Sequence, residues 1–289
     1  MHTSKKYRSR FFSSIILLFR RARYHKIGSA GAQSAFFFIL AMFPFIIFTN
    51  TLVASLNIPK ESAIDFLTPI FPDQIVSFLS GYLDTINTSG AMSIFSMGIL
   101  LAVFTASKSV RTLTSAFDRA YETKTTGNFL SGMLFSMLFI ILFALIITSC
   151  ILLVALGNDF ITEALFNAGN SETLHTLIDI WRWSTTSILI FFSISLIYKL
   201  LPSKKVSFSE TLPGTFFALF GFLILTGGFS FYVNNIALSS FFYGSIGIVI
   251  LFMLWMYFIS IILILGAELN KIVSDIKKFQ KETDFNGNI

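Results

Sequence analysis

Charged residues are scarce in this sequence. Only 12% of its 289 residues are Asp, Glu, Lys or Arg, whereas a soluble domain usually carries about 25%. So few charged side chains cannot cover the surface of a soluble protein of this length. This shortage excludes a soluble globular enzyme and indicates a chain whose apolar surface faces lipid.

Cysteine and histidine are also rare. The single cysteine, Cys150, lies inside an apolar run, which excludes a disulfide framework and a cysteine-based metal site. His2 and His25 lie near the N-terminus and His175 lies in a distant segment, so no spacing groups them as metal ligands. The sequence also lacks a Gly-x-Ser-x-Gly motif and a phosphate-binding loop. We therefore expect no catalytic residues, no metal ion and no cofactor.

The sequence instead contains several long runs without a charged residue. Apolar residues make up 54% of the chain, which contains 36 phenylalanines and has a mean hydropathy of +0.77. The longest run, 211–267, would measure roughly 85 Å as one helix, whereas the hydrocarbon core is about 30 Å thick. It must fold back, and the polar and small residues between Asn234 and Gly244 predict the turn there. The runs predict six membrane spans, at about 30–55, 88–107, 130–156, 181–201, 212–234 and 244–267.

These spans predict an all-α integral membrane protein, because every backbone polar group in hydrocarbon must be hydrogen-bonded within its own segment. Residues 11–19 are apolar but too few to cross, so we expect an amphipathic helix in the cytoplasmic interface. Two outer stretches, 73–86 and 160–178, are also amphipathic. They either cap a cavity mouth or rest on the lipid headgroups.

Basic residues predict the orientation. With six crossings, 19 of the 21 Lys and Arg residues fall on one side, and only Lys60 and Arg182 fall on the other. Because an excess of Lys and Arg marks the cytoplasmic side, both termini are predicted in the cytoplasm. The predicted divisions are a basic N-terminal segment at 1–27, a six-helix transmembrane domain at 28–270 and a cytoplasmic tail at 271–289.

The net charge of +6 has the same origin. The basic residues occupy four separate segments without interleaved aromatic side chains, which argues against a nucleic-acid partner. Near a membrane surface each is expected to contribute about 1 kcal/mol of attraction to anionic lipid headgroups. The lipid bilayer is therefore the predicted partner.

Polar residues inside the apolar runs are candidates for function, because such groups avoid lipid. Gln33 needs hydrogen-bond partners in a protein interior, whereas Gly28 and Gly31 are expected to let helices approach closely. Pro44 interrupts the same span and frees a carbonyl, and Asn50 follows it. This broken helix is either a binding element or a structural kink.

The segment after span two concentrates charge. On a helix, Arg111 and Asp118 would lie away from a face formed by apolar residues and one tyrosine, namely Val110, Leu113, Phe117 and Tyr121. Lys108, Arg111 and Arg119 either hold an anionic headgroup or belong to a solvated loop with local ion pairs.

Further candidates lie in the last two spans. Tyr232 and Asn234 lie near the predicted turn, and Glu268 lies at the cytoplasmic edge. Lys271 follows Glu268 by three residues, so a surface ion pair is the simpler interpretation. A cation or proton site would require Glu268 to point into the bundle.

Six separated pieces of the sequence, in this order, resemble the YihY/BrkB family of bacterial inner-membrane proteins, once labelled ribonuclease BN. They are 32–38 with Phe43-Pro44, Ser107-Lys108-Ser109 with 116–121, Leu201-Pro202, Leu212-Pro213-Gly214 with 228–233, 243–247 with 255–257, and 266–270. The resemblance implies a six-helix protein of the bacterial cytoplasmic membrane, in a family described as transporters. It lends no support to a ribonuclease, because the predicted cytoplasmic loops lack a metal-binding carboxylate cluster.

Two functions remain open from the sequence. The favoured one is a transporter or flippase-like protein that moves an amphiphilic or anionic substrate such as a lipid. The alternative is a non-transporting envelope scaffold that binds a partner through its outer helices.

Overall fold

A computed structural model of the chain describes residues 16–40, 92–123, 171–232 and 244–286, with single positions within 61–80 and 134–138. All regular structure in these segments is helical, which confirms the predicted all-α class for this part of the chain. Two helices occupy 16–24 and 27–40. The labelled helices are α5 (Met92–Ala120), α7 (Ser171–Leu200), α8 (Phe208–Tyr232) and α9 (Gly244–Asn286).

Three of these helices are long and apolar enough to cross a membrane, at Thr176–Leu200, Phe208–Tyr232 and Val249–Gln280. They overlap the last three predicted spans, although the third extends to Gln280, beyond the predicted end at 267. The shorter apolar helix Ile27–Leu40 covers the start of span one. Span three and the amphipathic stretch at 73–86 lie outside the described residues, apart from single positions.

The uncharged run 211–267 is divided between α8 and α9, as its length predicted. The predicted turn itself lies outside the described residues. Helix α8 begins at Phe208, before the predicted start of span five at 212, so Pro213 lies inside the helix. The Glu210 carboxylate accepts the Ser207 backbone N–H at 3.2 Å, and this capping contact begins the helix upstream of the proline.

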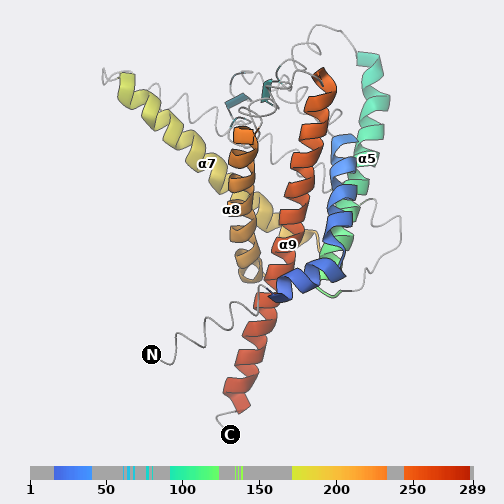
Figure 1. Cartoon of the computed structure of the whole chain (residues 1–289), viewed down its shortest axis with the longest axis vertical. Helices are drawn as coiled ribbons and strands as arrows, with labels where there is room; N and C mark the ends of the chain where they lie inside the picture. Colours follow the sequence, from blue (N-terminus) through green and yellow to red (C-terminus); the bar gives the residue numbers. More distant parts are fainter. Residues whose placement is uncertain are drawn as a thin grey trace.

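Two helices are longer than predicted. Helix α5 does not end near 107 but continues to Ala120, because Val110, Leu113 and Phe117 are all buried against the rest of the bundle. Glu122 closes this end of the helix, because its φ of 55° lets the Thr123 N–H reach the Asp118 carbonyl at 2.8 Å. Helix α9 runs through most of the predicted tail, to Asn286, and projects beyond the other described helices (Figure 1).

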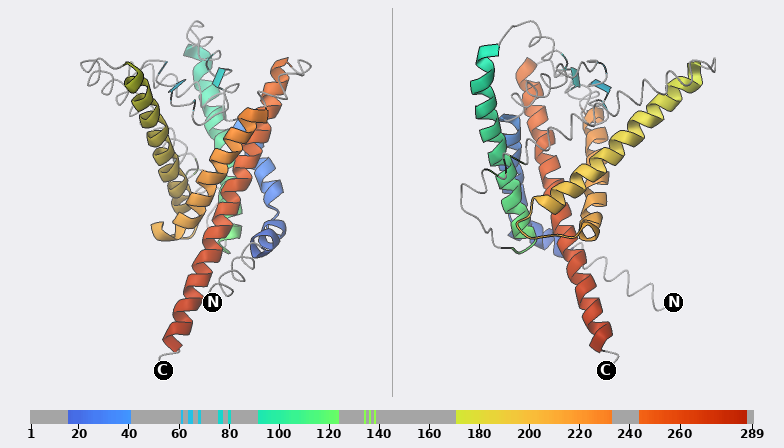
Figure 2. Two further views of the ribbon diagram at one scale, coloured as in Figure 1. Left: turned by 60° about the vertical axis from the view of Figure 1, so that its left-hand side comes forward. Right: turned by 180° about the vertical axis from the view of Figure 1, so that it is seen from behind.

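The helices converge at one end of the molecule. Helix α9 packs against α8 and α5, and α7 packs against α8. Figure 2 shows that α7 and α8 meet at the 201–207 connection and diverge toward their other ends. Helix 16–24 lies across the end where α5 stops and α9 projects (Figure 1).

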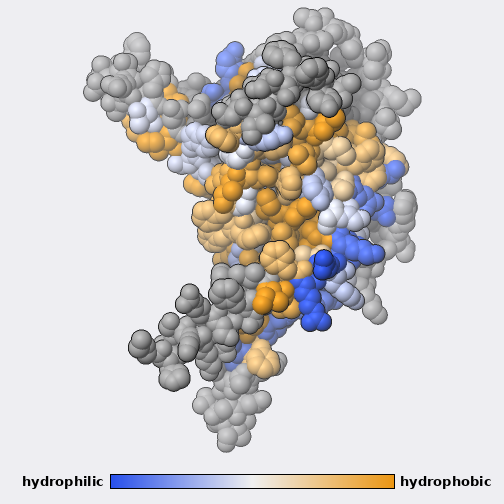
Figure 3. All heavy atoms as spheres, in the orientation of Figure 1, coloured by the Kyte–Doolittle hydropathy of each residue, from blue (hydrophilic) through white to orange (hydrophobic). Residues whose placement is uncertain are grey.

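The sides of these helices expose many large apolar residues, as a lipid-facing surface requires. Figure 3 shows this apolar surface over the middle of the molecule, with hydrophilic residues gathered near helix 16–24. The exposed residues on α7, α8 and α9 include Ile180, Ile188, Phe192, Phe216, Phe220, Ile224, Ile250 and Leu254.

Candidate functional site

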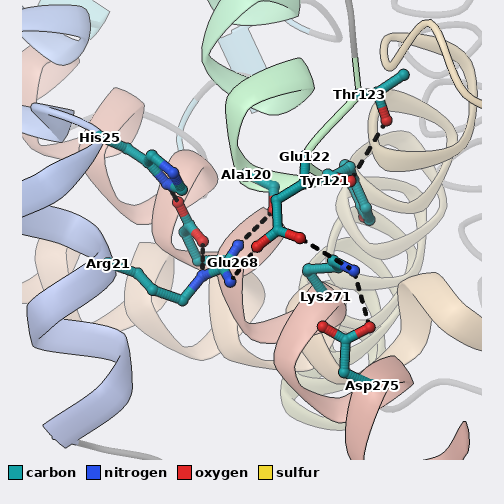
Figure 4. A network of polar contacts seen from close by, with 9 residues as sticks. All are labelled: Arg21, His25, Ala120, Tyr121, Glu122, Thr123, Glu268, Lys271 and Asp275. Carbon is teal, nitrogen blue, oxygen red and sulfur yellow. Dashed lines mark hydrogen bonds and ion pairs between the residues drawn. The ribbon is translucent and has the colours of Figure 1, made fainter.

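Arg21 and His25 project from the helix at 16–24 and the turn that follows it. A spacing of four residues places both side chains on one face of this helix. Lys26 adopts a positive φ of 51°, so the chain turns there and re-enters a helix at Ile27. Figure 4 shows that both side chains point toward Glu268 on α9.

Glu268 is completely buried, and both of its carboxylate oxygens are occupied. Arg21 Nε lies 2.6 Å from Oε2, and His25 Nδ1 bonds Oε1. The predicted surface ion pair between Glu268 and Lys271 is therefore wrong. Lys271 instead contacts Asp275 at 2.8 Å and Glu122 at 3.6 Å, because the helix turns Glu268 inward.

Arg21 joins three separate elements. Besides Glu268 it contacts the Glu122 carboxylate through Nη1 at 2.8 Å and donates to the Ala120 carbonyl through Nη2 at 2.7 Å. That carbonyl belongs to the C-terminal end of α5, which attracts a cation. We call this group the Glu268 network: Arg21, His25, Glu122, Glu268, Lys271 and Asp275 (Figure 4).

Neighbouring groups keep Arg21 and Glu122 ionised. Burial lowers the pKa of Arg21, but the hydrogen bonds and charges of Glu268 and Glu122 outweigh it, so this pKa is raised. The Arg21 hydrogen bond in turn holds the pKa of Glu122 below its usual value. Arg21 is therefore a permanent cation between two carboxylates.

A second buried contact is centred on Asn270, two residues after Glu268 on α9. Asn270 accepts the Gly214 N–H through Oδ1 at 2.6 Å and donates to the Tyr121 hydroxyl through Nδ2 at 3.3 Å. Burial, together with the charge of Glu210, raises the pKa of Tyr121 to about 12, despite the opposing hydrogen bond from Asn270. The amide thus ties α8, α9 and the end of α5 together.

Asp118 was predicted to lie away from the apolar face, yet it is buried. Its carboxylate accepts the Ser203 backbone N–H at 2.8 Å and the Ser203 hydroxyl at 2.7 Å. The predicted apolar face is otherwise confirmed, since Val110, Phe117 and Tyr121 are buried. Asp118 therefore anchors the connection between α7 and α8.

The basic candidates on α5 are spread along the helix. The exposed Lys108 ammonium lies 4.7 Å from the centroid of the Phe104 ring and 5.8 Å from that of Phe37. Arg111 is half-buried, and Arg119 is exposed near the end of the helix.

The remaining candidates lie apart from the Glu268 network. Gln33 is exposed rather than interior, and its neighbour Ser34 is buried instead. Tyr232 is partly exposed at the end of α8. Pro44, Asn50 and Asn234 lie outside the described residues.

Of the two glycines predicted to let helices approach closely, Gly31 does so. A Cβ on Gly31 would lie 3.0 Å from Ile261 Cγ1, and one on Gly28 would lie 3.5 Å from the Tyr257 hydroxyl. Helix 27–40 therefore approaches α9 closely at Gly31, whereas the space at Gly28 would accommodate a Cβ.

Arg21 and His25 were not among the predicted site residues. Their i, i+4 spacing beside an apolar run indicates that the two side chains share a helix face. That spacing does not identify their partner Glu268, which lies 247 and 243 residues further along the chain. Within the described segments, no three His, Cys, Asp or Glu side chains gather in a way that could hold a metal ion.

Apolar helices long enough to cross a bilayer, packed around buried polar contacts, define a helical membrane protein. The sequence pattern of the family described as Virulence factor BrkB matches residues 18–286, and the chain belongs to this family. This confirms the resemblance found in the sequence.

Two relatives extend the comparison. The ribonuclease-like protein YfkH of Bacillus subtilis is 30% identical over 93% of this chain and 98% of its own length. A UPF0761 membrane protein of Pseudoalteromonas atlantica is 24% identical over 85% of this chain and 80% of its own. No solved structure matches the chain.

Proposed function

We propose that this protein is a transporter or flippase-like protein that moves an amphiphilic or anionic substrate, with phospholipid as the favoured class. The supporting observation is Glu268, a completely buried carboxylate on an apolar helix long enough to cross a membrane. Such ionisable residues are costly and commonly mark substrate or ion pathways.

The Glu268 network has the connections expected of a gate. A single side chain of helix 16–24, Arg21, contacts both Glu268 on α9 and the end of α5 at Ala120 and Glu122. Displacing helix 16–24 would separate all of these contacts at once. We therefore assign the network to the closed state of one end of the bundle.

The substrate class follows from the basic side chains along α5. Lys108, Arg111 and Arg119 on α5 supply cations for an anionic headgroup, and the exposed apolar sides of α7 and α8 suit acyl chains. Gln33, Pro44, Asn50, Tyr232 and Asn234 remain predicted contacts along the path. The proposal includes no catalytic step and no ribonuclease activity.

We further propose six crossings of the bacterial cytoplasmic membrane with both termini in the cytoplasm. Support comes from the basic segments, which gather at one end through the Arg21–Ala120, Asp118–Ser203 and Ser274–Glu210 contacts. In a Cys150→Ser background, Arg23→Cys and Lys204→Cys should resist a membrane-impermeant maleimide in intact cells, whereas Lys60→Cys should react. The reverse pattern would contradict this orientation.

Transport is tested with purified protein in vesicles that contain fluorescent phosphatidylglycerol or, for comparison, fluorescent phosphatidylcholine. Loss of fluorescence to an external reductant reports movement from the inner leaflet. We expect faster loss with the anionic lipid than in protein-free vesicles. Arg21→Gln should increase the rate by opening the gate, whereas Arg23→Gln, an exposed change on the same helix, should not.

Two outcomes would contradict the proposal. Rates equal to protein-free vesicles for both lipids and all variants would favour the envelope scaffold. Equal effects of Arg21→Gln and Arg23→Gln would show that the Glu268 network does not gate the movement.

A further inference from the structure

We infer that the His25–Glu268 pair is a proton-binding site and that its proton holds the gate closed. This inference rests on the proposed function for the meaning of the gate, but the proton site itself is tested separately. In this proposal, binding and release of the proton control the position of helix 16–24.

The first argument is charge balance. The Glu268 network contains three carboxylates, Glu122, Glu268 and Asp275, and two permanent cations, Arg21 and Lys271. One negative charge is therefore left over when His25 is neutral. A proton on His25 brings the network to neutrality.

The second argument is position. Glu268 has no exposed side-chain surface, and the His25 side chain is 12% exposed. Since Nδ1 of His25 bonds Oε1 of Glu268, the imidazole connects solvent to the buried carboxylate. The proposed proton therefore belongs to the pair rather than to either side chain alone, because the two side chains are in direct contact.

The third argument is that the surrounding groups do not compete for this proton between about pH 5 and 8, where imidazole changes charge. The raised pKa of Arg21 keeps it cationic, and the lowered pKa of Glu122 keeps it anionic. Tyr121, with a pKa of about 12, stays neutral. The charged and titratable groups on the elements around the pair are Arg20, Arg21, Arg23, Tyr24 and Lys26 on the N-terminal segment, Asp118, Arg119, Tyr121 and Glu122 at the end of α5, Glu210 on α8, and Lys271 and Asp275 on α9.

The direction of the effect follows from these charges. At low pH the protonated pair balances the network, and helix 16–24 is held against α9 by two cationic contacts. When the proton leaves, the two cations Arg21 and Lys271 face three carboxylates, and the closed arrangement weakens. Proton release therefore favours the open gate.

The test measures the gate itself in full-length protein in lipid nanodiscs. Spin labels are placed on Arg23→Cys and Lys277→Cys in a Cys150→Ser background, since both positions are exposed. We expect a short distance at low pH and a longer or broader distribution at high pH, with a midpoint between about pH 5 and 8. A distribution that stays constant over this range would overturn the inference.

Variants at position 25 identify the titrating group. His25→Gln should remove the pH dependence, and His25→Lys, which keeps a cation, should stay closed throughout. His175→Gln is the matched control and should keep the parent profile. A pH dependence that survives His25→Gln would also overturn the inference.

The lipid assay separates this inference from the proposed function. If lipid moves but the spin-label distances do not change with pH, the proposed transport is supported and the proton site is rejected. A gate that responds to pH through His25, without lipid movement, would retain the proton site and reject lipid transport.

Discussion

Gly214 of α8 and Gly266 of α9 bring two helix backbones into direct contact. A Cβ on Gly214 would lie only 2.2 Å from the Gly266 carbonyl oxygen and 2.6 Å from Asn270 Nδ2. The Tyr198 hydroxyl of α7 donates to the Leu263 carbonyl at 2.9 Å beside this contact. Small residues thus let three helices meet just beneath the Glu268 network.

Gly214→Ala should therefore destabilise the protein strongly. The new methyl group meets backbone atoms that cannot move aside, and overpacking of this kind costs typically about 1–3 kcal/mol. Gly228→Ala on the same helix is the control, because nothing lies within 4 Å of its Cβ position. Thermal unfolding in detergent should show a clearly lower melting temperature for Gly214→Ala but not for Gly228→Ala. Similar melting temperatures for the two variants would contradict the close contact.

Asp118→Ala should release the connection between α7 and α8. The buried carboxylate accepts two hydrogen bonds from Ser203, and bonds to a charged group contribute about 1.5–3 kcal/mol each. Trypsin should then cleave faster after the exposed Lys204 and Lys205. Asp275→Ala, which removes only an i, i+4 pair with Lys271, should leave the cleavage rate unchanged.

Much of the helical framework could be predicted from composition and periodicity. The length of the 211–267 run required two helices, and the spacing of Val110, Leu113 and Phe117 identified the buried face of α5. The ends of helices were harder to predict. The end of α5 depends on a positive φ at Glu122, a residue type that gives no local signal for it.

The site was less predictable, because its contacts join distant segments. Local spacing suggested Lys271 as the partner of Glu268, whereas packing of helix 16–24 against α9 supplies Arg21 and His25. Asp118 shows the same limit. Its helical position could be derived from the sequence, but its partner Ser203 arrives only when the α7–α8 connection folds over it.

Tyr121 predicts a change in stability at alkaline pH. Its pKa is raised to about 12 by burial, so the folded state favours the neutral phenol. The resulting stabilisation is complete below about pH 10, the ordinary tyrosine value, and is lost as pH rises toward 12. Tyr121→Phe should be less stable than the parent at pH 8, since Asn270 loses a partner, and this gap should narrow above pH 10.

Denaturant unfolding of both proteins from pH 8 to 11.5 measures that gap. Because only the difference between parent and variant is used, other titrating groups cancel to first order. A gap that stays constant or widens with pH would show that Tyr121 is not held neutral by its surroundings.

Replacing Arg21 and replacing Glu268 should lower the free energy of unfolding by different amounts. Arg21→Met leaves a buried carboxylate without its permanent cation, and breaking a buried pair in this way costs about 3–5 kcal/mol. Glu268→Gln should cost less, because Arg21 keeps Glu122 and the Ala120 carbonyl as partners. The double variant should be more stable than the sum of the two losses predicts, by about 0.5–3 kcal/mol, as expected for residues in direct contact.

Chemical unfolding of the parent, the two single variants and the double variant gives this coupling free energy. Arg23→Met on the exposed face of the same helix provides the control and should change the free energy of unfolding little. If His25 carries the shared proton, the loss caused by Arg21→Met should also be smaller at pH 5.5 than at pH 8, because a protonated imidazole then still balances Glu268. Strict additivity, or a loss independent of pH, would mean that Glu268 is stabilised by other groups than Arg21 and His25.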